Sequence, residues 1–112
     1  MDVRVTEEKG IVIISLAGKI MGGPEAGQIN DSINSLIEKG KTKIIIDLEK
    51  VDLMNSSGLG ILIGAVTTLK NNNGKLCLIN TSDRIRNLLR ITKLERVFEI
   101  KPDLEAALSI MQ

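Results

Sequence analysis

The chain has 112 residues, of which 43% are hydrophobic, and it contains no linker-like tract of Pro, Gly and Ser, so we expect a single domain spanning residues 1–112. Its 15 Lys and Arg residues nearly balance its 14 Asp and Glu residues, leaving a net charge of +1. No strong electrostatic field therefore favours nucleic acid, an anionic membrane or an acidic ligand as the partner.

The first residues predict a β-hairpin. DVRVTEE (residues 2–8) alternates apolar and polar side chains, whereas GIVIISLAG (residues 10–18) is almost continuously apolar. A Lys-Gly pair separates the two segments, so we expect an antiparallel pair of strands. The continuous run predicts that the second strand is buried on both faces.

A helix and a central strand come next. Pro24 and Glu25 suit a first helical turn, and Gly40 is placed to end the helix. Between them, apolar residues recur at i, i+4, i+7 and i+8, namely Ile29, Ile33, Leu36 and Ile37. KTKIIIDL (residues 41–48) is a short apolar run typical of a central strand, which we expect to end at Asp47.

The second half repeats the alternation of helix and strand. A helix is predicted over residues 57–69, with one apolar stripe formed by Leu59, Leu62, Ile63, Val66 and Leu69. KLCLI predicts a strand, Ser82 caps a third helix, RVFEI predicts a short strand, and Pro102 opens a last helix. The order β-β-α-β-α-β-α-β-α predicts an α/β fold, a mixed sheet of about five strands with helices packed against it.

The head of the second helix carries an unusual set of residues, in the stretch DLMNSSGLGILIGAV. The first turn of a helix exposes unpaired N–H groups and about half a positive charge, which favours an oxygen anion there. Asn55 or Ser56 could supply the N-cap. Taken alone, however, Asn-Ser-Ser is simply a good helix start.

Three glycines near this point favour a functional interpretation. Gly58, Gly60 and Gly64 each destabilise a helix by about 1 kcal/mol relative to Ala, which suggests that something approaches the backbone closely. A second face of the helix, formed by Gly58, Ile61, Ala65 and Thr68, is small and apolar. Either another element of the fold or a different protein could cover it, and we favour a partner protein. The predicted docking residues are Met54, Gly60, Ile61, Gly64, Ala65 and Thr68.

The stretch IIIDLEKVDLMNSSGLGIL resembles the signature of bacterial anti-sigma factor antagonists of the STAS domain family, and the order of elements matches along nearly the whole chain. The resemblance implies that the unmodified protein binds an anti-sigma factor that is also a serine kinase, which frees the sigma factor. Phosphorylation by that kinase, with ATP, ends the association. By the same resemblance Ser56 is the phosphoacceptor, supported by Asn55, Ser57 and Gly58, and a phosphatase acts on phosphorylated Ser56.

Two positions depart from the family pattern. Asn55 stands where the family usually has an acidic residue before the acceptor, and Met21 replaces the usual acidic residue in the loop after the second strand. Asn can still cap a helix, but it lacks the negative charge. The alternative function is therefore a non-switching STAS scaffold or a ligand-sensing interaction domain without a cycle on Ser56.

The chain contains no histidine, which removes Ser-His-Asp and Cys-His nucleophiles and histidine metal sites. Cys77 is the only cysteine and alternates like a buried strand residue, so we expect core packing. We expect no enzymatic activity, metal or cofactor. The basic cluster of residues 84–96 either meets an acidic partner or faces water. The N-terminal segment lacks a secretory signal layout, and the apolar runs are shorter than the roughly 20 residues of a membrane span, which predicts a cytoplasmic protein.

Overall fold

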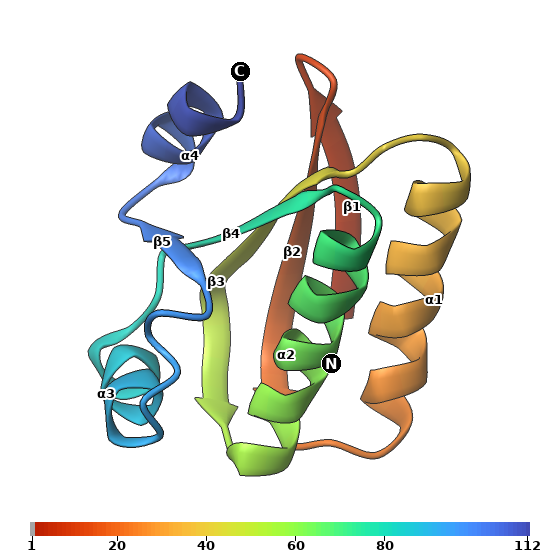
Figure 1. The fold of residues 1–112 in the computed structure, drawn as a ribbon. Helices are drawn as coiled ribbons and strands as arrows, with labels where there is room; N and C mark the ends of the chain where they lie inside the picture. Colours follow the sequence, from red (N-terminus) through yellow and green to blue (C-terminus); the bar gives the residue numbers. More distant parts are fainter. Residues whose placement is uncertain (1) are drawn as a thin grey trace.

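The computed structural model describes residues 2–112 and contains one five-stranded sheet with four helices (Figure 1). The order of elements is the predicted one. Their bounds are β1 Asp2–Glu8, β2 Ile11–Ile20, α1 Pro24–Glu38, β3 Lys43–Met54, α2 Ser56–Asn71, β4 Lys75–Ile79, α3 Asp83–Ile91, β5 Glu99–Lys101 and α4 Leu104–Met111. The predicted mixed α/β fold is confirmed.

The sheet has the strand order β1-β2-β3-β4-β5, with β1 antiparallel to β2 and the other pairs parallel. Lys9 and Gly10 link the first two strands, and both have positive φ (55° and 80°), as a tight hairpin turn requires. Each later crossover moves one strand further in the same direction. Because such crossovers are right-handed, they place their helices on the same face of the sheet.

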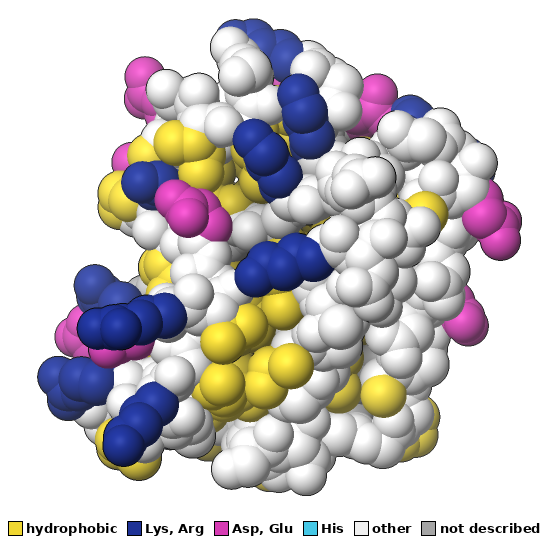
Figure 2. Space-filling model, in the orientation of Figure 1, with side chains coloured by type: hydrophobic (Ala, Val, Ile, Leu, Met, Phe, Trp, Pro, Cys, Tyr) yellow, Lys and Arg dark blue, Asp and Glu magenta, His cyan; other side chains and the backbone are white. Residues whose placement is uncertain are grey.

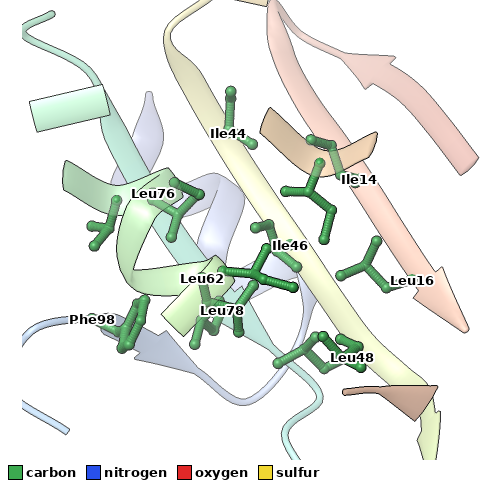
Figure 3. Close-up of a cluster of buried hydrophobic side chains, with 14 of the residues drawn as sticks. Ile14, Leu16, Ile44, Ile46, Leu48, Leu62, Leu76, Leu78 and Phe98 are labelled. Carbon is green, nitrogen blue, oxygen red and sulfur yellow. The ribbon is translucent and has the colours of Figure 1, made fainter. Parts of the chain in front are cut away.

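Two apolar clusters, one on each face, hold the layers together. The larger cluster joins α1, α2 and α3 to the sheet and includes Ile14, Leu16, Ile44, Ile46, Leu48, Leu62, Leu76, Leu78 and Phe98 (Figure 3). The smaller cluster joins α4 to Ile45, Cys77 and neighbouring strand residues. Alternate residues of β3 thus enter opposite clusters, which explains why its sequence is continuously apolar.

Two predicted strand bounds were wrong. β3 does not end at Asp47 but continues to Met54, because β2 is long enough to pair with it through Ile20 opposite Met54. The register of this pairing shifts twice, between Ser15 and Ala17 and between Gly18 and Lys19. In RVFEI only Glu99 and Ile100 belong to β5, since Phe98 packs into the larger cluster before the strand begins.

None of the helices within residues 2–112 combines the length and the apolar character that crossing a bilayer requires.

Replacing Ile46 by Ala should lower the free energy of unfolding by about 2–5 kcal/mol, because Ile46 is fully buried in the larger cluster and its loss leaves a cavity. Urea denaturation followed by circular dichroism measures the change. Val5→Ala is the control, since Val5 is 49% exposed on the edge strand and its truncation should change stability by less than about 0.5 kcal/mol. Equal losses in the two variants would contradict this account of the core.

Candidate functional site

The candidate site lies where β2 and β3 end and α2 begins, at one end of the sheet (Figure 1). Asn55 is the N-cap of α2, with extended backbone, and its side-chain Oδ1 accepts a hydrogen bond of 2.8 Å from the Gly58 N–H. The Asn55 N–H donates to the Ile20 carbonyl at 3.4 Å. The cap therefore also links the start of α2 to the end of β2.

Ser56 and Ser57 occupy the first two positions of α2, and both are exposed. Helix geometry leaves the N–H groups of these positions without an acceptor inside the helix. The first turn carries no acidic side chain to offset the positive end of the helix dipole. A hydroxyl at this point is accessible to a partner, and an anion attached to it would be stabilised by the helix end.

Gly58 leaves no room for a side chain at the candidate site. A Cβ built on Gly58 would lie 1.9 Å from the Ile20 carbonyl oxygen, which is far inside van der Waals contact. Gly22, in the loop between β2 and α1, has φ +96°, and a Cβ there would lie 2.9 Å from the Ser57 Cβ. The predicted close backbone approach is therefore found at Gly58, where the end of β2 makes it, but not at Gly60 or Gly64.

The predicted docking face of α2 requires a correction. Met54, Ile61 and Ala65 are buried, with exposed fractions of 6%, 7% and 0%. α1 packs beside α2, and Ile61 and Ala65 join the larger cluster together with residues of α1 (Figure 1). Another element of the same fold thus covers this face, and the expectation that it is free for a partner was wrong.

The remaining predicted docking residues keep contact with solvent. Gly60 is exposed, and Gly64 and Thr68 are partly exposed. Cβ atoms built on Gly60 and Gly64 would meet nothing within 4 Å, so neither glycine is required by packing inside the fold.

The outward face of α2 runs along a different stripe, which we call the α2 stripe and define as Ser56, Gly60, Ile63, Gly64 and Thr67. Its members follow Ser56 at i+4, i+7, i+8 and i+11, and residues 56–69 include no charged side chain. Ile63, which the periodicity predicts on the buried stripe, is only partly buried, and the exposed Thr67 lies outside the predicted docking face. Counting helical spacing from Ser56 would have identified both.

Apolar side chains extend the surface on either side of the α2 stripe. Met21, in the loop that touches Ser57, is 41% exposed. Between α2 and α3, Figure 2 shows a group of yellow side chains, and Ile63 and Leu88 are partly exposed apolar residues of these two helices. An uncharged, partly apolar surface next to an accessible hydroxyl is suited to contact with a protein.

Other reactive groups lie away from this surface. Burial raises the pKa of the Cys77 thiol to about 11 from 9.0, and the nearby Glu99 carboxylate adds to the shift. At neutral pH Cys77 is thus a protonated core side chain and a poor nucleophile. Within residues 2–112, no three His, Cys, Asp or Glu side chains gather in a way that could hold a metal ion. Asp47 accepts hydrogen bonds of 3.0 Å from the Glu49 N–H and the Asn80 amide.

Comparison with known proteins agrees with the fold and the sequence signature. The family model described as STAS domain matches residues 2–107. An anti-sigma-B factor antagonist of Listeria monocytogenes is 34% identical over 88 residues, which are 79% of this chain and 76% of that protein.

Solved structures share the fold as well. An anti-sigma factor antagonist from Mycobacterium paratuberculosis superposes with a TM-score of 0.83 at 24% identity, covering 98% of this chain and 92% of that one. The phosphorylated form of the Bacillus cell fate determinant SpoIIAA superposes with a TM-score of 0.74 at 25% identity, covering 97% and 99%.

Two glycines of α2 should respond oppositely to the same substitution. Gly58→Ala should destabilise the protein by about 1–3 kcal/mol or more, because the added Cβ collides with the Ile20 carbonyl. Gly60→Ala should stabilise it by about 0.5–1 kcal/mol, since the site is open and Ala is the better helix former. Chemical denaturation of both variants measures the difference, and a stabilising Gly58→Ala would refute the close approach.

Proposed function

The chain belongs to the STAS domain family, and we propose that it is an anti-sigma factor antagonist whose association with its partner ends when Ser56 is phosphorylated. The observation that carries the proposal is the exposed Ser56 hydroxyl at the first position of α2, at one end of an uncharged outward stripe. The relative in Listeria monocytogenes has the name anti-sigma-B factor antagonist, and a structure of similar fold is that of a phosphorylated form.

The partner would dock on the α2 stripe. Glycines at positions 60 and 64 let another backbone approach the helix closely, while Ile63 and Met21 add apolar contact. Because α2 carries no charge before Lys70, docking would not require the desolvation of a charged helix face. The unmodified surface is thus suited to a tight, largely uncharged contact.

Phosphorylation of Ser56 would change that surface without disturbing the fold. It adds about −1.5 to −2 charges and three acceptor oxygens. Within this chain, the positive end of α2 and its free N–H groups accommodate them. In the docked complex the same charge must be desolvated against the partner, and a loss of affinity of about 10²–10³-fold follows if the interface does not compensate it.

The partner is an anti-sigma factor that is also a serine kinase and brings its own ATP, while a phosphatase restores Ser56. This chain acts by binding, as one domain in the cytoplasm, with no cofactor and no enzymatic step. Asn55 holds the helix start through its bond to the Gly58 N–H. Ser57 is exposed beside Ser56, and the assignment of Ser56 as the acceptor rests on the resemblance to the family signature.

Incubation with the anti-sigma factor kinase and ATP should transfer one phosphate to each chain, mapped to Ser56 by mass spectrometry. Ser56→Ala should remove the phosphate, whereas Ser57→Ala, the neighbouring exposed hydroxyl, should retain it. Binding of the kinase without any phosphate transfer would favour the non-switching scaffold. Transfer to Ser57 would contradict the assignment of Ser56 as the phosphoacceptor.

Substitutions at Ser56 should separate binding from the switch. Ser56→Ala should bind the anti-sigma factor within about twofold of the parent, whereas Ser56→Asp should weaken binding by about tenfold or more through its buried charge. Isothermal titration calorimetry measures both affinities. Ser109→Asp is the matched control, since Ser109 is exposed on α4, on the other face of the sheet, and should not change affinity. Full affinity of Ser56→Asp would contradict the electrostatic mechanism.

A further inference from the structure

A second surface lies at the opposite end of α2 from Ser56. A groove of about 430 Å³ is formed by the last turns of α2, the start of β4, the loop before β5 and the end of α4. Lys70, which borders it, is fourteen residues beyond Ser56, a rise of about 21 Å along the helix. The proposed docking surface around Ser56 therefore does not account for this groove.

The groove combines an apolar floor with basic walls, and we call it the basic groove. Its apolar residues include Val66, Leu76, Val97 and Ile110, and the last of these is 38% exposed. Lys70, Lys75 and Arg96 line it, and all three are exposed. Figure 2 shows yellow side chains near α4, with several dark blue side chains and one magenta one beside them.

The charge of the basic groove is not balanced within the fold. Glu99 is the one carboxylate among its lining residues, against three cationic side chains. The Glu99 carboxylate also lies 3.6 Å from the Lys101 Nζ, so part of its negative charge is balanced by Lys101 rather than by the groove. The groove is therefore positive although the whole chain has a net charge of only +1.

We infer that the basic groove binds an acidic, amphipathic segment of a partner protein, in which apolar side chains contact the floor and carboxylates face Lys70, Lys75 and Arg96. Val66 and Leu76 are only 3% and 5% exposed, so the apolar area that a partner could bury belongs mainly to Val97 and Ile110. The charge match would orient the segment and exclude basic partners. Nucleic acid fits less well, because the only aromatic residue, Phe98, is 5% exposed and offers no stacking platform.

The test is a titration of the ¹⁵N-labelled full chain with the acetylated, amidated peptide EELLEELLEE, followed by NMR. Amide shifts are expected at Lys70, Leu76, Val97 and Ile110, with the N-terminal turn of α2 unaffected. The peptide KKLLKKLLKK should give no such shifts. Equal binding of both peptides, or no shifts with the acidic one, would overturn the inference.

Charge reversal provides the decisive variants. Lys70→Glu combined with Arg96→Glu should weaken binding of the acidic peptide at least about tenfold. The control, Lys39→Glu combined with Arg84→Glu, makes the same change in net charge at exposed residues outside the groove and should keep the parent affinity. Equal losses of affinity in the two double variants would show that overall charge causes the effect, and would contradict the basic groove as the binding site.

Further variants and competitors test whether the acidic peptide occupies the basic groove itself. Ile110→Asp should also weaken binding of the acidic peptide, since it places a carboxylate on the groove rim; circular dichroism checks that each variant is folded. Ser56→Asp should leave this affinity unchanged, so the groove and the proposed switch fail or succeed separately. If sodium decanoate displaces the peptide from the same residues, or if the chain alone self-associates through them, the occupant is a small amphiphile or a second copy and the inference is wrong.

Discussion

The contact between Gly58 and the carbonyl of Ile20 is the constraint on which the candidate site depends. The absence of a side chain at Gly58 lets the first turn of α2 lie directly against the end of β2, with Asn55 bonded to both elements. The start of the helix is therefore fixed by the sheet. This fixed start sets the direction in which the N-terminus of α2 points. It also sets the position of Ser56, which is the first residue after the N-cap.

In α2, the residues that stabilise the fold are different from the residues that a partner can reach. The buried residues of α2 pack against the sheet and α1, whereas Ser56 and Gly60 are exposed and only Ile63 of the α2 stripe packs against the larger cluster. A modification at Ser56 can therefore alter what binds without unfolding the domain. The helix dipole adds to this effect. It stabilises a negative charge at Ser56 in the free domain, whereas a docked protein would have to desolvate that charge.

Much of the fold could be predicted because its signals are local. The hairpin, the helix caps at Asn55 and Ser82, and the order of strands and helices depend on residues close together in the sequence. The end of β3 could not be predicted in this way. Residues 48–54 are mixed in polarity, and their strand conformation depends on pairing with β2, which lies distant in the chain.

The sequence by itself determined the alternation of elements, the capped start of α2 and the position of Ser56 on it, because capping, turn chemistry and periodicity act over a few residues. Only the tertiary structure decided which side of α2 is free. Two apolar stripes can both be buried when a helix lies on a sheet beside another helix, and here α1 covers the face of Ile61 and Ala65. Periodicity reports that a face is apolar, but what packs against it depends on residues far away in the chain.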